Sequence, residues 1–221
     1  MQVDLKNKRK EELEHMIEGR KEEVVLAAIE VFKEKGIDNT KMTDVAKKAE
    51  IGVASVYRYF KTKLDLTIEA AMMVWTQEMD DLYARYESKA AKAEDGITSV
   101  EGILTVFIEL FEHHPEFLTF IHEFDGYMVR EQVDQEKLEA YENGIVDVKH
   151  MLISALEKGM ADGSIRQGID AEAYYYTTTH ALMSLAQKLL LRGHILNSDD
   201  RVSDKRQIQM LIRMVVDYLK P

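Results

Sequence analysis

The sequence predicts an all-α protein in which a small N-terminal three-helix domain precedes a larger helical domain. Two prolines and 11 glycines in 221 residues favour helices over architectures built from strands and tight turns. Apolar residues recur at helical spacing along most of the chain, and a hydrophobic content of 46% is normal for a globular protein with a buried core. The chain has no cysteine, which excludes disulfides, thiolate zinc sites and cysteine nucleophiles.

The charge is unevenly distributed along the chain. The formal net charge is −11, but residues 1–66 carry 14 Lys and Arg against 13 Asp and Glu, whereas residues 67–221 carry 15 against 27. An acidic total therefore does not exclude a local nucleic-acid surface in the first third. The first residues lack an apolar stretch, and no apolar run approaches the roughly 20 residues that cross a bilayer. We therefore expect a soluble, cytoplasmic protein without a membrane partner.

Three short helices are expected in the first third. The first runs from Arg20 to Gly36, the second follows Thr40 as its N-cap, and the third spans Val53 to Phe60. The residues expected to face the core are Val25, Ala28, Ile29 and Phe32 on the first, Met42, Val45, Ala46 and Ala49 on the second, and Val56 and Phe60 on the third. This arrangement suits a helix-turn-helix, although periodicity alone does not separate it from another small helical hairpin.

Longer helices are expected in the rest of the chain. Thr62 and Asp65 form a capping box that opens a helix running to residue 86, and Thr98 and Glu101 form a second capping box. Pro115 interrupts the helical pattern. The other expected elements are a loop over residues 87–97, a helix over 137–160, a helix over 171–192 capped by Asp170, and a last helix that follows Ser203 and ends at Leu219.

A set of residues in the first third has the spacing of one known DNA-binding domain. The set comprises Arg20, Ala27, Ala28, Phe32, Gly36, Thr40, Val45, Ala46, Ala49, Val56, Tyr57, Arg58, Tyr59, Phe60, Lys63 and Leu66. On these positions, residues 18–66 resemble the DNA-binding domain of the tetracycline-repressor (TetR) family of transcriptional regulators. The resemblance is specific, because apolar, turn and aromatic positions meet different physical requirements at one fixed spacing. The remaining residues resemble the family only in helical content and length.

The resemblance implies that residues 53–59 form a recognition helix that lies in the major groove of operator DNA. Its first residues would reach base edges, where Val53 and Ala54 offer apolar contact to thymine methyl groups and Ser55 offers a hydroxyl. The residues that would contact the DNA backbone are Thr40, Thr43, Tyr57, Tyr59 and Lys63. Arg58 could reach either a guanine or a phosphate.

Two positions depart from the family pattern. Glu50 stands where the turn usually has glycine, and Gly52 stands where the usual cap is serine. A non-glycine residue at positive φ is strained by about 1 kcal/mol. Either the turn differs, or Glu50 tolerates the strain. Gly52 remains an acceptable but weaker cap.

These observations divide the chain into residues 1–17, 18–66 and 67–221. Residues 18–66 are expected to be the helix-turn-helix domain, and residues 67–221 the effector-binding and dimerisation domain. Residues 1–17 contain the basic cluster Lys6, Lys8, Arg9 and Lys10. This cluster indicates a basic arm or helix extension that reaches DNA, or else a disordered, solvated chain end, which is the commoner case.

The aromatic stretch 109–128 suggests an apolar effector pocket, which the family resemblance also implies. The candidate lining residues are Trp75, Met79, Phe111, Phe120, Phe124, Tyr127, Met151, Tyr175 and His180. The alternative for each of them is ordinary core packing or, for the histidines, a solvated surface.

The last two expected helices carry more apolar surface than one neighbour can cover, which predicts a homodimer held by a four-helix bundle. The residues expected in the interface are Tyr174, Thr178, Ala181, Leu185, Ile208, Leu211, Ile212, Val215 and Leu219. Such a dimer would present two recognition helices to a palindromic operator.

Together these features predict a ligand-responsive DNA-binding regulator, most simply a repressor that a small molecule releases from its operator. The alternatives are a helical adaptor that does not bind DNA and, less favoured, a helical-bundle enzyme. A di-iron bundle would need two Glu-x-x-His pairs, and the chain has one, at Glu12 and His15. We therefore expect no enzymatic activity, no metal site and no cofactor.

Overall fold

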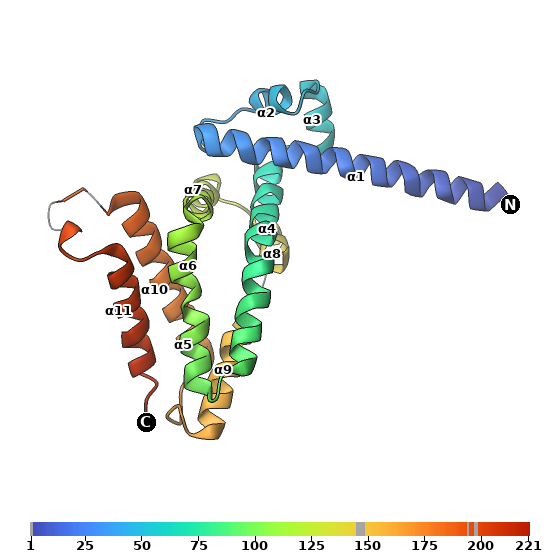
Figure 1. Cartoon of the computed structure of the whole chain (residues 1–221). Helices are drawn as coiled ribbons and strands as arrows, with labels where there is room; N and C mark the ends of the chain where they lie inside the picture. The colour runs from blue at the N-terminus through green and yellow to red at the C-terminus, as the bar shows by residue number, and fades with distance from the viewer. Residues whose placement is uncertain (1, 145–148, 194, 197–198) are drawn as a thin grey trace. The chain divides into compact units, whose positions relative to one another are not determined.

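The structure is a computed structural model that describes residues 2–144, 149–193, 195–196 and 199–221. These residues form helices joined by short turns, and no strand occurs among them (Figure 1). The chain divides into two compact units, of which the first comprises residues 1–74 and 123–144 and the second residues 75–122 and 145–221. The sequence pattern places a division at residue 66, and it gives no sign that residues 123–144 pack with the N-terminal helices.

The first unit contains α1 (Gln2–Lys35), α2 (Met42–Lys48), α3 (Val53–Tyr59), the start of α4 (Lys63–Lys92), the end of α7 (Pro115–Glu131) and α8 (Gln135–Gly144). Its core is made by the apolar stripes expected on the first helices, including Val25, Ala28, Phe32, Val45, Val56, Phe60 and Leu66. Helix α1 begins at Gln2 instead of near Arg20, and its first half extends beyond α3 (Figure 1). Residues 2–17 are therefore a helix extension, not a disordered end.

The turn between α1 and α2 corrects one expected cap. Gly36 ends α1 as expected, with φ +79° and its N–H donating to the Phe32 carbonyl at 2.8 Å. The cap of α2 is Lys41, not Thr40. Thr40 is only 3% exposed, and its hydroxyl donates instead to the Gly36 carbonyl at 2.8 Å.

Helix α4 opens on the expected capping box but ends later than expected. The Thr62 N–H donates to Asp65 Oδ2, and the Asp65 N–H donates to Thr62 Oγ1, both at 3.1 Å. The helix continues to Lys92, because the residues after position 86 are mostly Glu, Lys and Ala, which are good helix formers.

The expected second capping box is wrong. Asp95 caps α5 (Gly96–Leu104) by accepting from the Thr98 N–H at 2.9 Å. Thr98 is therefore already inside the helix. Aspartate at this position is among the strongest N-caps.

The second unit contains the rest of α4, α5, α6 (Val106–His113), the start of α7, α9 (Lys149–Asp162), α10 (Ala171–Arg192), the short 3-10 helix η1 (Asp199–Arg201) and α11 (Asp204–Asp217). Helices α10 and α11 lie side by side (Figure 1). The single helix expected over 137–160 is two helices, α8 and α9, and the residues between them lie outside the described part. Pro115 occupies the first position of α7, where its missing N–H costs nothing.

Two continuous helices, α4 and α7, run from one unit into the other. None of the helices within the described ranges is both long and apolar enough to cross a membrane.

Candidate nucleic-acid interface

The turn between α2 and α3 is a helix-ending motif with Glu50 at its left-handed position. Glu50 has φ +54°. Its N–H donates to the Lys47 carbonyl at 3.3 Å, and the Ile51 N–H donates to the Ala46 carbonyl at 3.0 Å. This pair of bonds is the Schellman pattern. The turn therefore keeps the geometry that glycine usually provides, and Glu50 adopts it under strain.

Helix α3 presents one side to the core and the other to solvent. Val56 and Phe60 are buried and hold the helix against its unit. Ala54 and Arg58 are exposed, and the Tyr57 side chain is 50% exposed. Val53, Ser55 and Tyr59 are half-buried. Gly52 caps the helix without a side-chain hydrogen bond.

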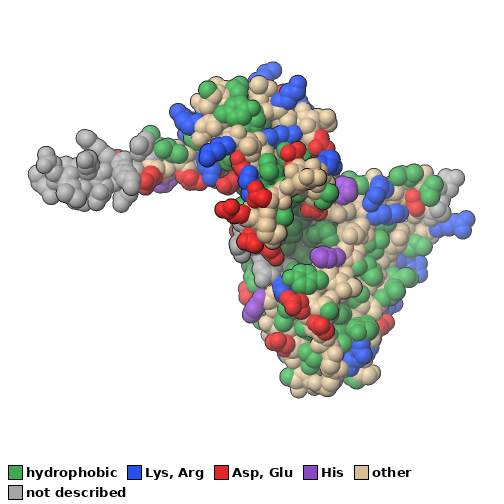
Figure 2. All heavy atoms as spheres, turned by 180° about the vertical axis from the view of Figure 1, so that it is seen from behind, with side chains coloured by type: hydrophobic (Ala, Val, Ile, Leu, Met, Phe, Trp, Pro, Cys, Tyr) green, Lys and Arg blue, Asp and Glu red, His purple; other side chains and the backbone are tan. Residues whose placement is uncertain are grey.

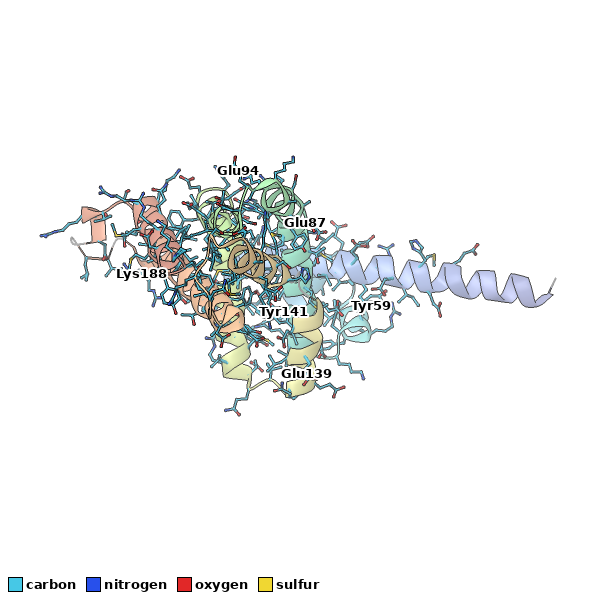
Figure 3. All side chains as sticks on the ribbon, turned by 90° about the horizontal axis from the view of Figure 1, so that it is seen from below. Tyr59, Glu87, Glu94, Glu139, Tyr141 and Lys188 are labelled. Carbon is cyan, nitrogen blue, oxygen red and sulfur yellow. The ribbon has the colours of Figure 1, made fainter. Side chains whose placement is uncertain are left out.

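Arg58 and Tyr59 form a local pair beside a groove. Arg58 Nη2 donates to the Tyr59 hydroxyl at 3.1 Å, and the guanidinium lies 5.1 Å from the Tyr59 ring centroid. Both side chains line a groove of about 690 Å³ between α1, the α2–α3 turn and α3. Figure 3 shows Tyr59 on α3 beside α1. Stacking on the ring holds Arg58 at this edge of the unit.

Two threonines were also expected to contact the DNA backbone. Thr43 is exposed, whereas Thr40 is buried in the first unit. Lys63 is half-buried, and its ammonium group donates to the Asp38 carbonyl at 3.0 Å. The same group lies 5.1 Å from the Tyr127 ring centroid. Burial lowers the pKa of Lys63 from its usual value. This lysine is therefore held within the first unit.

The charge on this surface is local and mixed. Figure 2 shows Lys and Arg side chains spread over the part of the molecule formed by α1, α2 and α3, with Asp and Glu side chains among them. Lys48 is bound by Glu30 at 2.7 Å and by Glu34 at 3.1 Å. Glu50 lines the same groove as Arg58. Arg58 is thus the exposed cation of α3.

The residues expected to line an effector pocket are divided between the two units. Trp75 of the second unit packs edge-on against Phe117, with ring centroids 4.9 Å apart. Met79, Phe120 and Met151 are buried there, Phe111 and Tyr175 are half-buried, and His180 is exposed. Phe124 and Tyr127 lie in the first unit, where the centroid of the Phe124 ring lies 4.8 Å from that of Tyr141. Tyr141 belongs to α8 (Figure 3).

One polar side chain in the second unit was missed by the sequence analysis. Gln187 of α10 is 8% exposed, and its Nε2 is the buried side-chain atom without a hydrogen-bond partner in the described part of the chain. An unsatisfied buried donor costs about 1–3 kcal/mol, so such a group commonly serves a bound molecule or a water. In the sequence, the only sign of this buried amide is a glutamine within an apolar helix.

The expected dimer residues fall into two sets. Tyr174, Thr178, Ile208, Ile212 and Leu219 are buried within their own unit, and Ala181, Leu185, Leu211 and Val215 are half-buried. The Tyr174 hydroxyl donates to the Val215 carbonyl at 3.1 Å, which ties α10 to α11. The exposed apolar side chains of α11 and the residue after it are instead Met210, Met214 and Tyr218. A groove of about 410 Å³ between α10 and α11 is lined by Leu185, Met210, Leu211 and Met214, among others.

Among the residues that the structure describes, no group of three or more His, Asp or Glu side chains is placed to hold a metal ion.

Comparisons with known proteins identify the domain that carries this surface. Residues 24–76 match the family described as "Bacterial regulatory proteins, tetR family". The chain is 26% identical over 157 residues to the HTH-type transcriptional repressor KstR2 of Mycolicibacterium smegmatis, a match that covers 71% of this chain and 72% of that protein.

Two solved structures share the fold. A TetR-family transcriptional regulator from Mesorhizobium loti superposes with a TM-score of 0.67 at 18% identity, over 93% of this chain and 98% of that one. FadR of Bacillus subtilis, solved in complex with stearoyl-CoA, superposes with a TM-score of 0.61 at 17% identity, over 88% of this chain and 96% of that one.

Proposed function

We propose that this chain is a transcriptional repressor of the TetR family, which binds a two-fold symmetric operator as a homodimer and leaves it when a small molecule binds. The observation that carries the proposal is the arrangement of α2 and α3. The buried Val56 and Phe60 fix α3 against its unit, while Ala54, Tyr57 and Arg58 stay exposed on one side of it. A helix presented in this way fits the major groove.

The contacts we propose are Val53, Ala54 and Ser55 at base edges, with Thr43, Tyr57, Tyr59 and Lys63 at phosphates and Arg58 at either. Thr40 is left out, because its hydroxyl is committed to the Gly36 carbonyl.

Selection of duplex DNA from a random pool, at near-physiological salt, tests the DNA contacts. The wild type should enrich a two-fold symmetric motif, and its affinity should fall steeply with salt. The double variant Tyr57→Ala/Lys63→Ala should lose the enrichment. The matched control is Tyr176→Ala/Lys92→Ala, which removes an exposed tyrosine and an exposed lysine from the second unit. Equal enrichment by both double variants would refute the proposed contacts.

We place the dimer contact on the outer side of α10 and α11. The apolar side chains available there are Leu185, Met210, Leu211, Met214 and Tyr218. Pairing these helices with their copies would bury this surface in a four-helix bundle.

Sedimentation velocity at micromolar concentration tests this arrangement. The wild type should sediment as a dimer, and Met214→Glu, which places a charge in the proposed contact, should sediment as a monomer with unchanged helix content. Met16→Glu, a substitution of an equally exposed methionine on α1, should remain dimeric. A monomeric wild type would refute the proposal.

For the effector, we propose a molecule with a long apolar chain and an oxygen acceptor, with long-chain acyl-CoA thioesters as the first class to test. Three points support this class: the stearoyl-CoA bound to the FadR relative, the aromatic and methionine side chains of the second unit, and the buried Gln187 amide. Binding would shift the population toward a form with lower operator affinity. Because α4 is continuous between the units, a small tilt of it would move α3.

Fluorescence anisotropy of labelled operator DNA tests this step. Stearoyl-CoA should release the DNA at concentrations at which free coenzyme A does not. Identical operator affinity with and without saturating stearoyl-CoA would refute the acyl-CoA class.

A further inference from the structure

The second half of α7 is joined to the helix-turn-helix by three side chains on one face. Glu123, Tyr127 and Arg130 follow the spacing i, i+4, i+7, which places them in one narrow stripe of the helix. All three contact residues of the first unit, to which residues 123–144 also belong.

Two of these side chains hold the turn between α1 and α2. Glu123 Oε2 accepts from the Ile37 N–H at 3.2 Å. Arg130 Nη2 donates to Asp38 Oδ2 at 2.5 Å. The turn therefore receives one hydrogen bond to its backbone and one ion pair to its side chain from α7. The ion pair is exposed, so it positions the turn more than it stabilises the protein.

The third side chain lies under Lys63. The Tyr127 ring is buried, and the Lys63 ammonium lies 5.1 Å from its centroid while it donates to the Asp38 carbonyl at 3.0 Å. A cation over an aromatic face is attracted to it. The carbonyl that accepts from Lys63 belongs to the residue whose carboxylate Arg130 binds. One stripe of α7 therefore fixes both partners of the lysine.

A DNA phosphate would compete with the Tyr127 ring and the Asp38 carbonyl for the Lys63 ammonium. We propose that Glu123, Tyr127 and Arg130 are positioning residues that set how readily Lys63 is released to DNA phosphate. The inference rests on the proposed DNA contact of Lys63. It adds α7 to α4 as a second helix through which a conformational change of the protein would alter operator affinity.

Lysine ε-CH₂ signals in ¹³C-labelled protein test the release directly. Protons above an aromatic ring are shifted upfield, so the Lys63 ε-CH₂ signal, assigned with Lys63→Gln, should lie upfield in the free wild type. It should move to the ordinary lysine position when the selected operator duplex is added. A signal that stays upfield in the complex would overturn the inference while leaving DNA binding intact. A wild type that binds no duplex at low salt would overturn the proposed function as well.

Variants of the ring give a second readout. Tyr127→Leu removes the ring but keeps apolar bulk, and it should tighten operator binding about two- to five-fold, the effect of losing one cation–π contact. The slope of log affinity against log salt should stay unchanged, because Lys63 contacts phosphate in both complexes and the number of phosphate contacts is the same. Tyr127→Phe keeps the ring and should restore the wild-type affinity.

The double variant Tyr127→Leu/Lys63→Gln separates positioning from a merely structural role. If Tyr127 acts through Lys63, the gain in affinity disappears in the double variant. A gain that persists without Lys63, or a loss of affinity in Tyr127→Leu itself, would overturn the inference. Arg130→Gln, at an exposed position that does not endanger folding, should shift the free Lys63 signal part of the way toward the ordinary position. An unmoved signal in that variant would remove Arg130 from the group.

Discussion

Replacing Glu50 with glycine should stabilise the protein. Glu50 holds the left-handed position of the α2–α3 turn at φ +54°, where an L-residue with a Cβ costs about 1–2 kcal/mol. Glycine removes this cost but loses about 0.5–1 kcal/mol more backbone entropy on folding. The expected net gain is therefore about 0–1.5 kcal/mol, which raises Tm by up to about 6 °C in a chain of this length.

The same substitution should also tighten DNA binding, for a separate reason. Glu50 lines the groove that holds Arg58, on the side of the unit that we propose faces phosphate. Two unit charges 10 Å apart in water interact by about 0.4 kcal/mol, which corresponds to about a two-fold change in affinity. Glu50→Gln removes the charge and keeps the strain. It should therefore tighten DNA binding without raising Tm.

Circular dichroism melting and operator anisotropy measure the two effects on the same samples. Ala49→Gly is the matched control, since Ala49 has φ −77° in the same turn and gains nothing from glycine's freedom. This variant should lose about 0.5–1 kcal/mol. A Glu50→Gly variant that melts below the wild type would refute the strain argument.

Three further substitutions test other parts of the structure. In Gly96→Ala the new Cβ would lie 2.1 Å from a backbone nitrogen of α9, so Tm should fall by several degrees, whereas Gly102→Ala, which has open space, should not lower it. Gln187→Leu removes a buried donor that has no hydrogen-bond partner in the described part of the chain. The ligand-free variant should melt at a higher temperature than the wild type, and its response to stearoyl-CoA should be weaker. A lower Tm would show that the Gln187 amide is satisfied in the wild type. A hydrogen bond from Lys35 lowers the pKa of Asp44 from its usual value, so this carboxylate stabilises the fold above pH about 4 and its contribution is lost as the pH falls through the lowered pKa. Asp44→Asn should therefore lose less stability than the wild type over that pH range. An unchanged dependence of stability on acid pH would contradict the assignment.

The sequence predicted the helix-turn-helix well because its information there is local. Val56 and Phe60 are buried, Gly36 ends α1 and α3 has the predicted start, and each of these outcomes depends on neighbours within a few residues. The error at Thr40 has the same local origin. Its hydroxyl bonds back to the carbonyl four residues earlier, a known alternative to capping for threonine.

The contacts of α7 with the first unit could not be predicted in this way. The partners of Glu123 and Arg130 lie 86 and 92 residues away in the chain. Helical spacing shows that Glu123, Tyr127 and Arg130 share a face, but it does not show what that face meets. For the same reason the expected pocket combined residues that the structure divides between two units, since aromatic density marks apolar surface and not its location.

Helix α11 shows why an apolar stripe does not by itself identify a dimer contact. The helix is apolar around most of its circumference, and the stripe with Ile208 and Ile212 is buried against its own unit. The side left exposed contains Met210 and Met214, which are 52% and 62% exposed. Flexible methionine side chains adapt readily to a partner surface.

The two sides of α11 should therefore respond differently to substitution. Ile212→Ala leaves a cavity in the unit and should cost about 2–5 kcal/mol of stability, with the protein still dimeric below its Tm. Met214→Glu should leave the fold intact and abolish the dimer. If Ile212→Ala instead yields a stable folded monomer, the buried stripe and not the exposed one contributes to the dimer contact, and the packing of α11 against its own unit would have to differ from the arrangement described above.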